Sequence, residues 1–166
     1  MNINKKGFTL TELMAVVIII GVLSGIGLGT YKKSVERSYF SEGQASGASI
    51  AEAVIRYTQE NGANNKPNFD ELDISLANSA VNAKDRYKIS SNNFCYTIST
   101  ISATSNISVT AARTNEGNCS GTAKYSLVYN ISGVNYSEYC TGNSDFCFSM
   151  GYKNSCTSNS SQCTKG

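Results

Sequence analysis

One apolar stretch near the N-terminus constrains this chain more than any other feature of its sequence. The stretch from Phe8 to Tyr31 contains a single charged side chain, Glu12, and a pair of lysines lies on each side of it. An apolar run of about 20 residues is long enough to cross the hydrocarbon layer of a membrane as a helix, and flanking basic residues are typical of such segments. The sequence therefore predicts a membrane-spanning helix over residues 8–31.

Glu12 is the residue that an ordinary membrane anchor does not explain. An acid within a membrane segment costs about 2.5–3.5 kcal/mol on insertion scales, so it is by default a functional residue. If the chain is cut between Gly7 and Phe8, the new α-amino group of Phe8 is a cation at neutral pH and lies about one helical turn from Glu12. A neighbouring subunit shifted along the helix axis satisfies both charges, and leaving either charge unpaired is the costly state. We therefore expect Glu12 to favour side-by-side assembly of helices.

The motif G-F-T-L-T-E-L at residues 7–13, with its basic leader and following apolar helix, resembles the type IV pilin family. Members of that family are cut after the glycine by a prepilin peptidase, methylated on the new N-terminal residue and packed into a filament. The resemblance covers about the first 35 residues and depends on fixed offsets. It implies that residues 1–7 are a leader ending at Gly7, that Phe8 becomes the methylated terminus, and that Glu12 meets the Phe8 amine of another subunit.

The resemblance also implies where the protein is found and what it contacts. The precursor is expected in the inner membrane with its N-terminus in the cytoplasm, and the mature chain in an extracellular pilus, as a homo-oligomer in a helical filament. Its other partners are then the prepilin peptidase and the pilus assembly machinery. Two alternatives within this machinery stay open: a pseudopilin of a type II secretion system, and a minor pilin whose head binds a ligand or DNA.

Two other kinds of N-terminal segment fit the sequence less well. A secretory signal peptide is cut after its apolar core, whereas the candidate cleavage site here precedes the core. A plain single-pass anchor gives no reason for Glu12.

The composition of the chain argues against enzymes and nucleic-acid binders. The absence of histidine excludes histidine-based acid–base catalysis and removes the commonest metal ligand. Of 14 basic residues two belong to the leader, which leaves twelve against 12 acidic residues in the mature chain. This balance provides no electrostatic footprint for nucleic acid. We expect a structural protein with no catalytic residues, no cofactor and no metal.

Glycines mark two parts of the predicted helix. Gly21, Gly25 and Gly29 are four residues apart, a spacing that lets neighbouring helix backbones approach closely in a membrane. Further along, Gly43 and Gly47 are poor helix formers, so packing against a sheet must hold that region helical.

The helix is expected to continue beyond the membrane as an amphipathic second half over residues 32–61. Its apolar stripe includes Val54 and Tyr57, and Asn61-Gly62 supplies a stop signal. Residues 62–92 are then expected to be a connecting loop with one short helical turn around residues 69–76, because they contain the only proline and an acidic cluster.

An acidic cluster lies within this expected loop, at Asp70, Glu71 and Asp73. Calcium binding would require carbonyl oxygens and a second segment to complete the ligand set. A solvated loop is therefore the preferred interpretation of these three carboxylates.

Residues 93–166 are predicted to form the head. Three segments alternate apolar and polar residues, at 94–101, 107–111 and 125–131, and turn residues separate them. Three such strands form an antiparallel meander with one apolar face, which the amphipathic helix covers. The expected fold class is thus α+β: a long N-terminal helix packed on a small antiparallel sheet, as the resemblance also implies. From residue 132 onward the tail has no sustained period.

All six cysteines lie beyond position 94, and this usage indicates an oxidising compartment. The sequence leaves many pairings open. Metal binding is the weaker interpretation because no C-x-x-C motif occurs. The spacing suggests, without choosing among alternatives, the disulfides Cys95–Cys119, Cys140–Cys147 and Cys156–Cys163.

Overall fold

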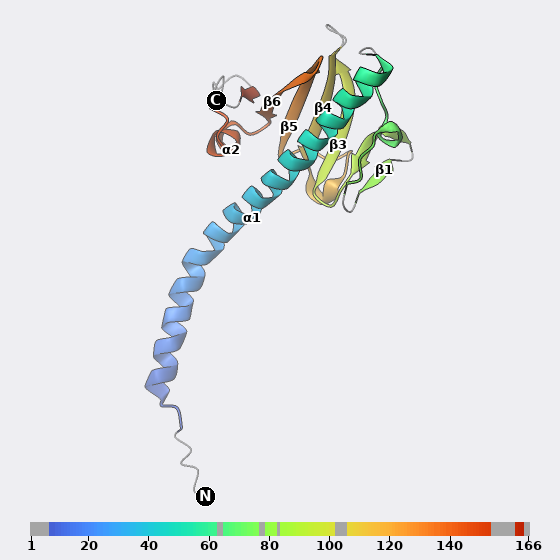
Figure 1. The fold of residues 1–166 in the computed structure, drawn as a ribbon. Helices are drawn as coiled ribbons and strands as arrows, with labels where there is room; N and C mark the ends of the chain where they lie inside the picture. Colours follow the sequence, from blue (N-terminus) through green and yellow to red (C-terminus); the bar gives the residue numbers. More distant parts are fainter. Residues whose placement is uncertain are drawn as a thin grey trace, which may run out of the picture. The chain divides into compact units, whose positions relative to one another are not determined.

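A single long helix, α1 (Leu10–Asn61), accounts for almost a third of the chain (Figure 1). The computed structural model describes residues 7–62, 65–76, 79–82, 84–101, 106–153 and 162–164. The chain divides into two compact units, Met1–Ser38 and Tyr39–Gly166, and α1 contributes residues to both.

The part of α1 in the first unit buries none of its apolar side chains within the chain. Phe8, just before the helix, is 79% exposed, and Tyr31 is 67% exposed. Among the described residues α1 is the one helix that is long and apolar enough to cross a membrane, judged by length and composition. The helix is unbroken through Gly21, Gly25 and Gly29. It therefore presents an apolar surface of the length and kind that a bilayer or a bundle of helices covers.

The part of α1 in the second unit is amphipathic, as predicted, and packs on a sheet. Its buried side chains include Phe40, Ile50 and Val54. Aromatic rings of the sheet contact the helix backbone at Gly43 and Gly47. A Cβ added to Gly43 would lie 2.5 Å from the Phe94 ring, and one added to Gly47 would lie 2.4 Å from the Tyr129 ring. Packing thus explains why two poor helix formers lie within this helix.

The helix ends where the sequence predicts. Asn61 is its last residue, and Gly62 follows with a positive φ of 96°. The Gly62 N–H donates to the carbonyl oxygen of Thr58 at 2.9 Å, which satisfies one of the last helical carbonyls.

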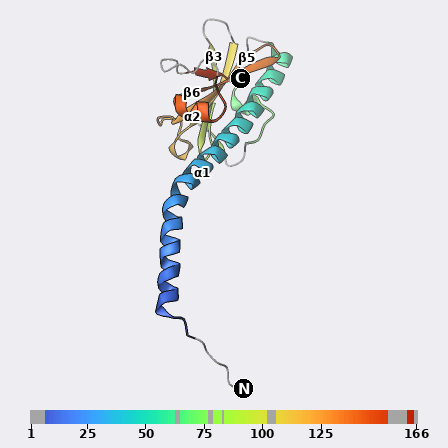
Figure 2. The same ribbon diagram turned by 90° about the vertical axis from the view of Figure 1, so that its left-hand side faces the viewer.

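The head contains an antiparallel sheet in which the described strands follow one another in sequence order, with no crossover (Figures 1 and 2). The predicted meander corresponds to the three central strands, and the α+β architecture is confirmed. The strands are β1 (Ala80–Asn82), β2 (Asp85–Ser90), β3 (Phe94–Ile101), β4 (Asn106–Arg113), β5 (Tyr125–Ser132), β6 (Asn135–Thr141) and β7 (Gln162–Thr164).

The register of the sheet places its apolar residues on the face that α1 covers. Ile98 pairs with Val109, and Val109 pairs in turn with Tyr129. All three side chains are at most 1% exposed. Because side chains alternate between the two faces of a strand, the hydroxyl-bearing residues between them point to the opposite face.

One sequence-based expectation is wrong, and two elements of the tail were not predicted. Residues 62–92, expected to be a connecting loop, contain the strands β1 and β2. The short 3-10 helix η1 (Phe69–Glu71) lies where one short helical turn was expected. Strand β2 was missed because it carries charged residues on both faces, and Ile89 is its only buried residue. The tail contains β6 and a short helix, α2 (Ser144–Ser149). Strand β6 (Asn135–Thr141) has the charged Glu138 at one of its inward positions, so its sequence does not alternate apolar and polar residues.

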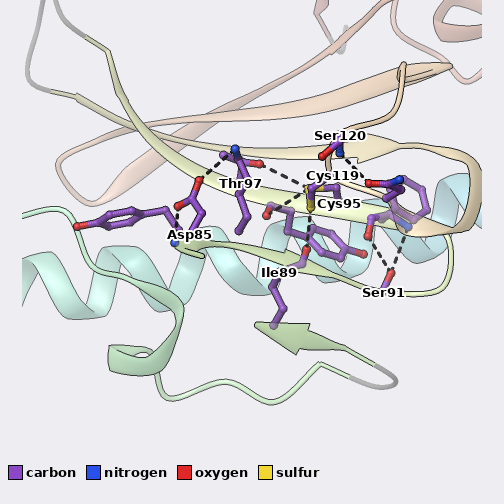
Figure 3. Close-up of a disulfide and its surroundings, with 12 residues drawn as sticks. Asp85, Ile89, Ser91, Cys95, Thr97, Cys119 and Ser120 are labelled. Carbon is purple, nitrogen blue, oxygen red and sulfur yellow. Dashed lines mark hydrogen bonds and ion pairs between the residues drawn. A yellow bond between two sulfur atoms is a disulfide. The ribbon is translucent and has the colours of Figure 1, made fainter. Parts of the chain in front are cut away.

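Two disulfides fasten the head, and both are pairs that the spacing suggested. Cys95 of β3 is bonded to Cys119, with Cα atoms 5.0 Å apart, and this bond lies beside Ile89 of β2 (Figure 3). Cys140 of β6 is bonded to Cys147 of α2, with Cα atoms 5.7 Å apart. In the third suggested pair, Cys156 lies outside the described residues.

Candidate functional site

The N-terminal end of α1 holds the predicted assembly residue, Glu12, in a capping box. The helix starts at Leu10, so Thr9 is its N-cap residue. The Thr9 backbone N–H donates to Glu12 Oε2 at 2.9 Å, and the Thr9 hydroxyl donates to the same oxygen at 2.7 Å. The Glu12 N–H lies 3.3 Å from the Thr9 hydroxyl oxygen. These reciprocal bonds satisfy donors that a helix N-terminus otherwise leaves free.

The capping box gives Glu12 hydrogen-bond donors from its own chain, which the sequence-based expectation of an unpaired acid did not include. Both bonds from Thr9 go to Oε2, and Oε1 accepts no hydrogen bond within the described part of the chain. A carboxylate oxygen has capacity for further donors. The cap therefore orients the carboxylate and leaves one oxygen for a donor from another molecule. The T-x-x-E motif at Thr9–Glu12 is the sequence signal of this cap, and it was not used in predicting the role of Glu12.

The predicted cleavage site lies just before the helix. Gly7, Phe8 and Thr9 are not helical, and all three are exposed. The peptide bond between Gly7 and Phe8 thus lies in non-helical, accessible backbone, which a peptidase can reach.

The predicted glycine ladder lies on open helix surface. A Cβ added at Gly21, Gly25 or Gly29 would meet nothing within 4 Å in this chain. These glycines therefore have no packing role within the described parts of the monomer.

The acidic cluster does not form a metal site in the described part of the chain. Asp70 pairs with Arg86 at 2.5 Å, and Asp73 pairs with Arg56 at 2.9 Å. Glu71 accepts the Asn68 backbone N–H at 2.8 Å and so caps η1. The three carboxylates are directed to three separate partners, and no group of acidic or cysteine side chains suited to a metal occurs among the described residues.

A second carboxylate, Glu138 of β6, joins α1 to the C-terminal region. Its Oε1 accepts the Gln44 side-chain N–H at 3.0 Å and the hydroxyl of Tyr152, and it lies 3.3 Å from the Tyr129 hydroxyl. Burial and the nearby carboxylate raise the pKa of both tyrosines well above the ordinary value. This cluster could not be predicted from the sequence, because its members come from four separate segments.

An aromatic cluster lies beside the polar one and packs the C-terminal region onto α1. The Phe40 ring lies 5.8 Å from the ring of Phe146 and 5.9 Å from that of Tyr152. Phe146 also stacks on Tyr125, with centroids 4.4 Å apart. These contacts and the Cys140–Cys147 bond hold α2 against the same face of the sheet as α1.

Comparison with known proteins identifies the N-terminal segment. Residues 2–28 match the family model described as the prokaryotic N-terminal methylation motif. Fimbrial protein EcpC of Eikenella corrodens is 43% identical over 58 residues, which are 35% of this chain and 38% of that protein. Type IV major pilin protein PilE1 of Neisseria gonorrhoeae is 37% identical over 62 residues, 37% of this chain and 38% of that protein. The N-terminal part of this chain is thus similar to that of type IV pilins.

The matched relatives cover only part of this chain. A fimbrial protein of Neisseria meningitidis serogroup B is 37% identical over 62 residues, 37% of this chain and 36% of that protein. The matches thus span less than two fifths of the length of each of these relatives. No solved structure matches the chain. The architecture of the head and its two described disulfides are therefore known from the present structure rather than from a solved relative.

Proposed function

We propose that this chain is a structural subunit of a type IV pilus. The observation that carries the proposal is the methylation motif at the start of an apolar helix whose side chains are uncovered in the monomer. Such a surface needs either lipid or neighbouring helices, and a filament of parallel subunits supplies the second. The relatives named fimbrial protein and major pilin support the same conclusion.

Processing is proposed to precede assembly. The prepilin peptidase cuts between Gly7 and Phe8, and the new terminus of Phe8 is methylated. The exposed, non-helical backbone at this bond supports the proposal. Before assembly the subunit stays in the inner membrane through residues 8–31, and afterwards its head lies outside the cell in the fibre.

Assembly is proposed to pair Glu12 with the Phe8 amine of an adjacent subunit. Thr9 holds Oε2 of Glu12, so Oε1 is the oxygen available to the incoming ammonium group. Gly21, Gly25 and Gly29 permit close approach of the neighbouring helix, because no side chain of the monomer covers them. The cap and the intersubunit pair use different oxygens, so forming the pair does not require the cap to break.

Two measurements test this proposal. The mature protein should begin at Phe8 with the added mass of a methyl group, as read by intact-protein mass spectrometry. Glu12→Gln should insert into the membrane normally and yet be largely absent from sheared surface fibres, whereas Glu60→Gln, which removes a carboxylate from the head, should be incorporated as the wild type is. A protein that still begins at Met1, or normal fibres from Glu12→Gln, would contradict the mechanism.

A further inference from the structure

A hollow of about 420 Å³ lies between the last turns of α1 and the turn that joins β5 to β6. Its volume falls within the range of about 300–1,000 Å³ that is typical of small-molecule sites. It lies on the head, far along α1 from the methylation motif, and the proposed assembly mechanism does not use it. Its lining consists of Glu52, Ile55, Arg56, Val134, Asn135 and Tyr136.

The walls of this hollow are fixed by contacts outside it. The Tyr136 ring packs edge-on against the ring of buried Tyr129, with centroids 5.5 Å apart. The guanidinium of Arg56 donates to Asp73 through Nη2 at 2.9 Å and through Nε at 3.3 Å. On the opposite rim, Ser132 pairs with Asn135, so a two-residue turn with Gly133 at a positive φ of 62° presents Val134.

The side chains of Glu52 and Asn135 in the lining make no hydrogen bond in the described part of the chain. The Glu52 carboxylate accepts no hydrogen bond there and interacts with Arg56 and Tyr136 only electrostatically, and the Asn135 side chain makes no hydrogen bond there. Arg56 retains N–H groups beyond the two that Asp73 uses, because a guanidinium has five. The hollow therefore offers both hydrogen-bond donors and acceptors.

The lining also has an apolar part, formed by Ile55, Val134 and the Tyr136 ring. Ile55 is 8% exposed and belongs to the core, whereas Val134 is 64% exposed at the rim. Together with the Tyr136 ring they form an apolar surface beside the polar groups. One carboxylate and one guanidinium face the hollow, so neither sign of charge dominates its lining.

We propose that this hollow is a binding site for a neutral saccharide. A pyranose ring has an apolar C–H face, which fits the Tyr136 ring and Val134, and a rim of hydroxyls that both donate and accept hydrogen bonds. Glu52 accepts from ring hydroxyls, while Arg56 and Asn135 donate to them. A cationic ligand would meet the Arg56 guanidinium, and an anionic ligand would meet Glu52, so a neutral polyol matches this lining best.

The proposal is tested with the full chain in a zwitterionic detergent that has no sugar headgroup. Saturation-transfer NMR is recorded with the methyl glycosides of glucose, galactose and N-acetylglucosamine at millimolar concentration. We expect transfer to the ring C–H protons of at least one glycoside. Glu52→Gln should weaken this binding about tenfold or more, because it replaces a charged acceptor.

Two further variants separate a lost site from a damaged fold. Val134→Lys places a long charged side chain at an exposed rim position and should block binding without loss of the tyrosine near-UV signal. Glu60→Gln, on the same helix but outside this hollow, should bind as the wild type does. No transfer to any of the three glycosides, or equal transfer in Glu52→Gln and Val134→Lys, would overturn the proposal. So would binding of lysine methylamide, a cationic probe, in the absence of glycoside binding.

Discussion

Replacing Gly47 by alanine tests whether the aromatic rings of the sheet hold α1 by packing on its backbone. Alanine is the better helix former by about 1 kcal/mol, so helix propensity alone predicts a more stable protein. The structure predicts the opposite sign, because the new Cβ would lie 2.4 Å from Cε2 of Tyr129. The hydroxyl of that tyrosine lies 3.1 Å from the Gln44 carbonyl oxygen, and its ring contacts Tyr136, so the ring is held on two sides.

The expected magnitude follows from these two opposing effects. An extra methyl group in a packed core costs about 1–3 kcal/mol. A separation of 2.4 Å is far inside van der Waals contact, so the upper half of that range applies at Gly47. Subtracting the propensity gain of about 1 kcal/mol leaves a net loss of about 1–2 kcal/mol in the free energy of unfolding.

The measurement is urea unfolding of the full chain in detergent, followed by the near-UV circular dichroism of the tyrosines. Gly47→Ala should lower the urea midpoint at an unchanged slope. Gly29→Ala is the matched control, because a Cβ there meets nothing within 4 Å. With no clash to oppose the propensity gain, it should leave the midpoint unchanged or raise it. A midpoint for Gly47→Ala at or above that of the wild type would show that the ring yields freely and would refute the packing argument.

Three other predictions concern the cap, the buried tyrosines and the disulfides. Thr9→Val should speed amide hydrogen exchange in the first turn of α1 about fivefold, since the N-cap hydroxyl is lost; unchanged exchange would contradict the capping role. The folded-state pKa of Tyr152 is raised, so its contribution to stability is complete below the unfolded value of about 10 and is lost as the pH rises above it. Urea titrations at alkaline pH should therefore show that Tyr152→Phe loses less stability with rising pH than the wild type does. An equal loss in both proteins would contradict a raised pKa of the Tyr152 hydroxyl. Removing the Cys95–Cys119 bond should cost about 3.5 kcal/mol and removing the Cys140–Cys147 bond about 2.5 kcal/mol, because the first closes the longer loop. Urea midpoints of the paired serine variants check that order, and the reverse order would show that loop entropy does not set it.

The sequence was sufficient for features that repeat or that carry a strong local signal. The apolar run before Tyr31, the helix stop at Asn61-Gly62 and the alternation in β3, β4 and β5 all correspond to elements of the structure. Each of these signals lies within a few adjacent residues. The two described disulfides also match the spacing, although spacing alone did not select them.

The features that were missed depend on contacts between distant segments. Strand β6 has Glu138 at an inward position, and only its contacts with Gln44, Tyr129 and Tyr152 make that position favourable. The hollow beside Glu52 brings together residues about eighty positions apart in the chain. Hydrophobic periodicity contains no information about such pairs, so neither feature was predictable without the fold.

The two rings that enter the backbone of α1 also have a mechanical consequence. Phe94 meets the helix at Gly43 and Tyr129 meets it at Gly47, one turn further along the same face. Sliding or rotating the helix by a single residue would bring a side chain against each ring, so the register between helix and sheet is locked. In the proposed fibre, a pull along the helix would thus act on the head as shear between helix and sheet, and the two rings would resist slippage before any strand separates.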